Sequence, residues 1–154
     1  MSIVAAVRRV SELIGQATIT GSGTRLQSID AGHGQPLDMA SQPEGPTRPY
    51  DLQVTATEDG GEAGCISTRV RVSALLTVRY RLAGSRLERG AQQAADYTAI
   101  RDVTCYAPAT WQQSSTGLVG MQLGPYAIAP LINAGQLSGT HELMTATFVL
   151  EVDP

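Results

Sequence analysis

The segment RVRVSALLTVRYRL, from Arg69 to Leu82, alternates between apolar and polar side chains at almost every step. Its even-numbered positions are apolar, and four of its odd-numbered positions are arginine. Because successive side chains of a strand point to opposite faces of a sheet, this pattern predicts a strand with one apolar face and one cationic face. The chain must therefore fold so that other elements cover the apolar face.

The same segment is long for a domain of this size. Its residues, at about 3.3 Å each, would reach roughly 46 Å, whereas a compact domain of this length is about 40 Å across. We expect the apolar centre of the strand to be buried beneath a helix and the arginines near its ends to lie beyond the covered zone. The strand should cross the whole domain, project from it or break at a bulge, and we infer that identical copies of the chain complete it.

Other segments also have the alternation of strands. The alternation from Tyr50 to Thr57 predicts a strand with one solvent-exposed face. The glycine-rich acidic turn EDGGEAG joins it to the arginine-bearing strand as an antiparallel hairpin. His141 to Val152 predicts a closing strand whose apolar face belongs to the core. Trp111 to Gly124 is compatible with a short strand, in which the glycines suggest bulges.

Two segments have helical periodicity. Apolar residues recur at steps of three and four from Ile3 to Ile14, and Gly15 ends that helix. Ser85 and Glu88 form a capping box that begins a second helix, which reaches about Cys105. The residues of this second helix expected to face the sheet are Leu87, Ala91, Ala94, Tyr97, Ile100 and Val103.

Residues 15–49 are rich in glycine and proline, and only brief extended segments are possible there, around Ala17–Thr20 and Arg25–Ile29. We interpret this region as a peripheral irregular loop, either functional or a surface excursion. Pro125 to Gly139 is also interpreted as a loop, with a helical turn near Ile128–Ile132.

The order of elements is therefore helix, hairpin, helix, and one or two strands. It predicts a single α+β domain over residues 1–154, in which an antiparallel β-sheet with a long β-hairpin is packed on one face by two α-helices. A chain of 154 residues with a hydrophobic fraction of 42% is large enough for one such core.

Charge and cysteine content narrow the class of protein. The formal charge is −3 and every basic residue is arginine, which argues against a nucleic-acid coat, because phosphate binding needs net local positive charge. We expect Cys65 and Cys105 to be unpaired thiols in a reducing compartment, with a disulfide as the less favoured alternative. The N-terminal segment is too charged for a signal peptide, and no apolar run reaches the ~20 residues needed to span a bilayer. We therefore expect folding in a cytoplasm and no membrane partner.

Fragments of catalytic motifs occur, and each is incomplete. Asp30, His33 and Asp38 form an acid–histidine cluster, but a metal site would need a further ligand. Ser-His-Asp catalysis would need Ser28 or Ser41 beside the histidine, and no nucleophile-elbow pattern surrounds either serine.

Two shorter fragments are equally incomplete. Gly21–Gly23 lacks the lysine of a phosphate loop, and His141–Glu142 lacks the second histidine of a zinc protease. We therefore predict a protein that is not an enzyme, with no catalytic residue, no metal and no cofactor.

Charges of opposite sign follow each other along the hairpin. Residues 69–89 hold six arginines and one acid, Glu88, whereas the preceding turn is acidic. Solvated arginines that protect a sheet edge are one explanation. The other is self-association, in which the acidic residues of one copy meet the arginines of its neighbour, and a heterologous contact of this kind can close a ring. The candidate inter-subunit contacts are Arg69, Arg71, Arg79, Arg81, Glu58, Asp59 and Glu62.

The layout of these elements resembles that of the tail terminator and tail-completion proteins of long-tailed bacteriophages and related gene transfer particles. The resemblance lies in size and in element order over most of the chain. The matching elements are an opening helix at Ile3–Ile14, a long loop, a hairpin with an acidic turn at Tyr50–Leu82, a capped helix at Leu87–Cys105 and a terminal strand at Leu143–Val152.

This resemblance implies a structural function. Proteins of this kind form rings, usually hexameric, at the end of a tail tube, end its growth and offer a surface to the head or neck. It implies a sandwich whose sheet joins neighbouring subunits, with the tail tube protein and a head-side connector or neck protein as partners, and a lumen through which DNA passes without specific binding. The protein would assemble in the host cytoplasm and belong to the virion, with the loop 15–49 docked on the tube or the head-side ring.

The sequence leaves three alternatives. The first is a head-completion or tail-tube subunit of the same particle. The second is a non-viral cytoplasmic binding module that uses the loop around His33 as its ligand site. The third is a small hydrolase that uses His33, Asp30 and Asp38.

Overall fold

The computed structural model describes residues 3–17, 25–28, 47–59, 69–82, 85–112, 116–133 and 136–153. The helices in these ranges are α1 (Ile3–Gly15), α2 (Arg86–Thr104) and α3 (Pro108–Gln112). The strands are β1 (Arg25–Ser28), β2 (Thr47–Asp59), β3 (Val70–Arg81), β4 (Leu118–Leu123), β5 (Ala127–Asn133) and β6 (Gln136–Val152).

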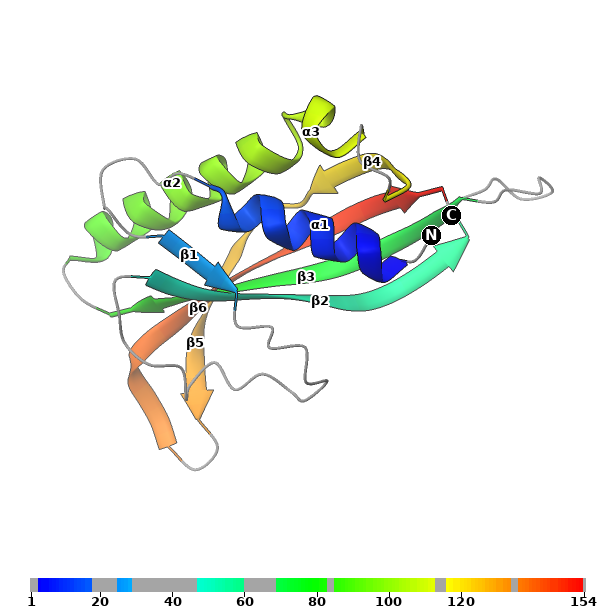
Figure 1. The fold of residues 1–154 in the computed structure, drawn as a ribbon. Coiled ribbons are helices and arrows are strands. Elements are labelled where there is room, and N and C mark those ends of the chain that lie inside the picture. Colours follow the sequence, from blue (N-terminus) through cyan, green and yellow to red (C-terminus); the bar gives the residue numbers. More distant parts are fainter. Residues whose placement is uncertain are drawn as a thin grey trace.

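All of the described strands belong to one sheet. Its order is β1-β2-β3-β6-β4, and β5 pairs with β6 as well. Strands β2 to β6 pair in antiparallel fashion, and β1 joins β2 in parallel. Both α1 and α2 lie over the same face of this sheet (Figure 1). The prediction of an α+β fold with a long hairpin and two helices on one face is confirmed.

The core lies between the helices and the sheet. The even-numbered side chains of β3 from Val72 to Tyr80 are at most 2% exposed, and those of β6 from Met144 to Val152 are at most 3% exposed. Val10 and Ile14 of α1 are fully buried against them. The alternation of the sequence therefore identifies the core face of both strands correctly.

Helix α2 begins where the capping box predicts it. The Ser85 hydroxyl accepts a hydrogen bond from the amide of Glu88 at 3.1 Å, and the Glu88 carboxylate accepts one from the amide of Ser85 at 3.3 Å. The predicted inner face of this helix is wrong in its first half, since Leu87, Ala91 and Ala94 are exposed. Polar side chains that bond to the sheet point inward instead. The buried residues of α2 are Gln93, Asp96, Ile100 and Thr104.

Strand β3 is an inner strand, so the inference that identical copies complete it is wrong. The whole length of β3 pairs with β6, from Val70 opposite Val152 to Arg81 opposite His141. β2 pairs with the other edge of β3 as far as Val78. The argument failed because it compared the strand with a spherical domain, whereas this sheet is elongated and its 17-residue β6 is longer than β3.

The segment predicted as a loop with a helical turn, Pro125 to Gly139, contains β5 and the start of β6. The apolar run AIAPLI does not alternate, so periodicity could not identify a strand there, and its pairing with β6 decides the structure. Residues 136–140 of β6 pair with β5 alone among the described strands. These residues and β5 form the hairpin arm, which extends away from the body of the sheet (Figure 1).

Several sequence predictions lie in or beside the loop region. β1 confirms the brief extended segment at Arg25, and β2 begins at Thr47, before the predicted end of the loop. Cys105 is a free thiol whose pKa is raised by burial. Outside the described residues lie Gly21–Gly23, Asp30, His33, Asp38, Ser41 and Cys65.

Candidate functional site

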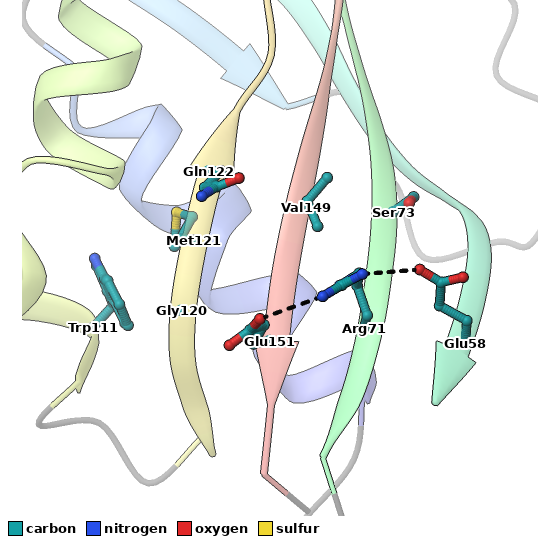
Figure 2. Close-up of a pocket in the computed structure, with 9 residues that line it drawn as sticks. All are labelled: Glu58, Arg71, Ser73, Trp111, Gly120, Met121, Gln122, Val149 and Glu151. Carbon is teal, nitrogen blue, oxygen red and sulfur yellow. Dashed lines mark hydrogen bonds and ion pairs between the residues drawn. The ribbon is translucent and has the colours of Figure 1, made fainter. Parts of the chain in front are cut away.

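A row of charged side chains crosses three strands on the face away from the helices (Figure 2). Glu58 of β2, Arg71 of β3 and Glu151 of β6 are direct cross-strand neighbours. Arg71 Nη1 lies 3.5 Å from Glu58 Oε1, and its Nη2 lies 3.8 Å from Glu151 Oε1. We call these three residues the carboxylate row.

A bulge in β2 places Glu58 in this row. The register of β2 against β3 shifts by one residue between Val54 and Ala56. Before the shift, even-numbered residues of β2 lie opposite even-numbered core residues of β3. After it, even-numbered residues of β2 lie opposite odd-numbered residues of β3, which brings Glu58 opposite Arg71. Since a one-residue shift exchanges the two faces of a strand, the bulge determines which face carries this carboxylate.

The carboxylate row holds two anions and one cation. The side chains of Glu58, Arg71 and Glu151 are 65%, 44% and 40% exposed, and ion pairs as exposed as these contribute less than about 1 kcal/mol each. Because two carboxylates share one guanidinium, the row is negative overall. Each carboxylate also keeps lone pairs that can accept from a further donor.

The row borders a concavity of about 750 Å³. Gly120 of β4 lines it, and a Cβ atom there would lie 3.1 Å from Glu151 Oε2, closer than ordinary van der Waals contact. Trp111 borders the concavity, and the Trp111 indole donates a hydrogen bond to the carbonyl of Thr104 at 2.7 Å. Carboxylates at the edge of a mostly polar hollow suit a cationic side chain. The remaining lining residues are Ser73, Met121, Gln122 and Val149.

The structure brings together two of the predicted inter-subunit residues, Arg71 and Glu58, and it does so within one molecule. Arg79 is only 4% exposed, so the expectation that it lies beyond the covered zone is wrong. Burial extends over both faces of β3 at this point, since Val78 and Tyr80 on either side of Arg79 are 0% and 2% exposed.

The other predicted contacts are less well defined by the fold. Arg69 and Arg81 are exposed at the two ends of β3. The side chain of Asp59 and the whole of Glu62 lie outside the described residues. An inter-subunit role for these residues stays a prediction.

A second concavity, of about 450 Å³, lies at the opposite end of the sheet, where β3 ends and α2 begins. Leu82 and Ile128 contribute exposed apolar side chains, 37% and 40% accessible, and Arg86 and Arg89 contribute cations. Arg81, the last residue of β3, and Arg86, the first residue of α2, are exposed and form no ion pair with any residue that the structure describes. We call Arg81 and Arg86 the arginine pair.

Glu142 lines the same concavity and is already engaged. Its Oε1 accepts hydrogen bonds from Arg89 Nε at 2.9 Å and from Gln93 Nε2 at 2.6 Å. These bonds fasten α2 to β6, and the Arg89 and Glu142 side chains are only 15% and 16% exposed. The fragment His141–Glu142 therefore supplies a helix anchor here.

A third cluster lies wholly inside the protein. The carboxylate of Asp96 on α2, which is 0% exposed, accepts hydrogen bonds from Arg48 of β2 and from the Tyr80 hydroxyl of β3. The Arg48 guanidinium also lies 5.1 Å from the centre of the Tyr80 ring. Burial raises the pKa of Asp96, against the opposing effects of Tyr80 and Arg48. Burial and the adjacent carboxylate raise the pKa of Tyr80 as well.

This cluster holds α2 on the sheet, and its three side chains are at most 10% exposed. The sequence analysis missed this cluster because it took only apolar and small residues of the helix as its inner face and did not consider Asp96. The available signal was the spacing of Gln93, Asp96 and Ile100, which is helical.

Within the described residues, no group of three or more His, Cys, Asp and Glu side chains could hold a metal ion, and no helix is long and apolar enough to cross a membrane. No protein-family model matches the chain, and a search of curated proteins finds no match either.

Proposed function

We propose that the chain is a structural virion protein that forms a ring, usually a hexamer in proteins of this layout, at the head-proximal end of a phage tail tube. There it would end tube growth and join the tail to the head or neck. The element order and the α+β sandwich support this proposal. The observation that carries it is the hairpin arm.

The hairpin arm presents apolar side chains to solvent. Ala127, Ile128, Ala129 and Pro130 are consecutive and all exposed. Because neighbouring residues of a strand point to opposite faces, both faces of β5 are apolar here. A consecutive exposed apolar run marks an association surface. In addition, residues 136–140 of the arm pair with β5 alone among the described strands. A two-stranded ribbon is at best marginally stable in water, so a neighbouring subunit packed against the arm would stabilise it.

The residues of the arm favour a contact in which side chains of the neighbouring subunit pack against it, rather than one in which a neighbouring strand extends its sheet. Pro130 has no amide hydrogen to donate to an added strand. A contact between the arm of one subunit and a different surface of the next is heterologous, and heterologous contacts generate rings when the rotation closes. A ring of this kind has two unlike faces, one for the tube and one for the head-side connector.

The first test measures assembly. We expect the purified protein to form rings of uniform mass by light scattering and in negative-stain images. Added during polymerisation of the tube subunit from the same genome, it should shorten the tubes. Ile128→Asp places a charge on the arm and should weaken ring formation roughly tenfold or more, because charges are unfavourable at the core of an interface.

Val54→Asp is the matched control, since Val54 is also 40% exposed on a strand. Both variants should keep the circular dichroism spectrum of the folded monomer. A monomer that persists at high concentration and leaves tube length unchanged would contradict the proposal. Rings that stack into tubes without another protein would assign the chain to the tube itself.

A further inference from the structure

The two ends of the sheet differ in the sign of their net charge, also when the exposed Arg69 and Asp153 that flank the carboxylate row are counted. The carboxylate row lies where β2 and β6 end, and the arginine pair lies where β3 ends and α2 begins (Figure 1). Arg71 and Arg81 are ten residues apart on one continuous strand, which corresponds to about 33 Å. Since salt screens exposed charges beyond about 10 Å, these two surfaces cannot satisfy each other within one molecule.

We propose that the arginine pair of one copy binds the carboxylate row of the next copy. This inference rests on the proposed function, and it names the two surfaces that meet at each subunit boundary of the ring. This pairing differs from the inter-subunit contact predicted from the sequence, in which the acidic turn meets the whole arginine-bearing strand. The change is needed because Arg71 is paired within its own chain and Arg79 is buried.

The carboxylate row is suited to an incoming guanidinium. It is negative by one charge, so a single arginine neutralises it, and the second arginine of the pair adds to the attraction between approaching subunits. The long distances from Arg71 to the two carboxylates, 3.5 and 3.8 Å, leave both carboxylates free to accept from a second cation. A planar guanidinium can donate to two oxygens at once, which lysine cannot do in the same geometry.

The shape of the surface also fits. The adjacent concavity of about 750 Å³ is within the range of ligand pockets, about 300–1,000 Å³. Gly120 gives the incoming side chain access to the Glu151 carboxylate, because any Cβ at that position would crowd it. On the other partner, Leu82 and Ile128 line the same concavity as Arg86, so that Arg86 is next to apolar residues of the hairpin arm and of the end of β3.

The test is a charge exchange with two double variants. Arg81→Glu/Arg86→Glu makes both surfaces acidic, and Glu58→Arg/Glu151→Arg makes both basic. Like charges placed across an interface cost several kcal/mol, so each variant alone should lose about 100-fold or more in assembly. A 1:1 mixture should assemble again, because every boundary in an alternating ring then joins unlike charges. The chain that carries all four substitutions should also assemble.

Two controls separate this inference from folding and from net charge. Thermal unfolding of each variant checks that the monomer is intact. Arg8→Glu changes an exposed arginine on α1 and should leave assembly unchanged. If both double variants assemble as well as the wild type, or if the intact variants fail when mixed, the pairing is wrong although the ring proposal stands. If the wild type never assembles, the proposed function is wrong and this inference is wrong with it.

Discussion

Asp96 is the residue through which α2 is joined to two strands at once. One of its carboxylate oxygens accepts from Arg48 and from Tyr80, and the other, Oδ1, is buried without a hydrogen-bond partner. Burial raises the pKa of this carboxyl, because an ionised group loses its hydration in the interior. The ionisation of Asp96 is therefore linked to the folding of the chain.

This linkage predicts a pH dependence of stability. The folded state binds the Asp96 proton more tightly than the unfolded chain does, so the stabilisation is complete below the ordinary aspartate pKa of about 4 and is lost as the pH rises through the raised folded pKa. Urea unfolding of the wild type and of Asp96→Asn over this range should show the advantage of the wild type shrinking as the pH rises. Asp102→Asn, at an exposed site on the same helix, should follow the wild type. A constant difference between the wild type and Asp96→Asn would contradict the linkage.

At this scale, sequence reasoning identified the exposed charges better than the buried ones. The pairing of Arg71 with Glu58 followed the expected attraction between the acidic end of the hairpin and its arginines, although within one copy. Arg79 was misplaced, and Asp96 was not named among the inner residues of α2, because a charged side chain is assigned to solvent unless its partner is known. Arg48, the partner of Asp96, lies on β2, far from it in the sequence.

Among the elements, those with a clear period or a cap were predicted most completely. The alternation of β3 and the capping box of α2 each reflect a local physical rule, and both are present in the structure. The hairpin arm has neither signal, because an apolar run is compatible with a helix, a strand or a loop. The bulge in β2 was not predicted either, because Thr55 has the same character as any other exposed strand residue.

Two glycines in these elements should respond to alanine in opposite directions. Gly117, at the start of β4, has a φ of 78°, and a Cβ atom there would lie 2.3 Å from the carbonyl oxygen of Asp153. Gly117→Ala should therefore lower the free energy of unfolding by about 2 kcal/mol or more. Gly90 lies on α2 with open space around it, so Gly90→Ala should raise the free energy of unfolding by about 0.5–1 kcal/mol. Urea unfolding of both variants measures this difference, and equal effects would contradict the local geometry.

At the scale of the whole molecule, the sheet has a centre that is paired on both edges and an extension that pairs with one strand among those described. β3 is bonded on both edges, whereas residues 136–140 in the hairpin arm have one strand as partner. The layers and the fold class followed from the order of elements. The position of β3 did not, because length alone cannot tell whether a strand is completed by its own chain or by another.

Amide hydrogen exchange should reveal this difference. In the monomer, the amides of β3 should exchange slowest and those of residues 136–140 much faster, because a ribbon that pairs with one strand opens locally more easily than a strand paired on both edges. On assembly, we expect exchange in the hairpin arm to slow while β3 is unchanged. If the arm is as protected as β3 in the isolated monomer, or is unaffected by assembly, it has no role in joining subunits.

The inner position of β3 also bears on how the chain is made. Its partner β6 is separated from it by α2, α3, β4 and β5, so β3 leaves the ribosome long before that partner is synthesised. Until then, the nascent chain carries an apolar strand with one open edge, which is the arrangement most prone to pair with other chains. Slow translation after β3, or truncation before β6, should therefore yield aggregates, and chaperones that bind extended apolar segments should associate with this protein during synthesis.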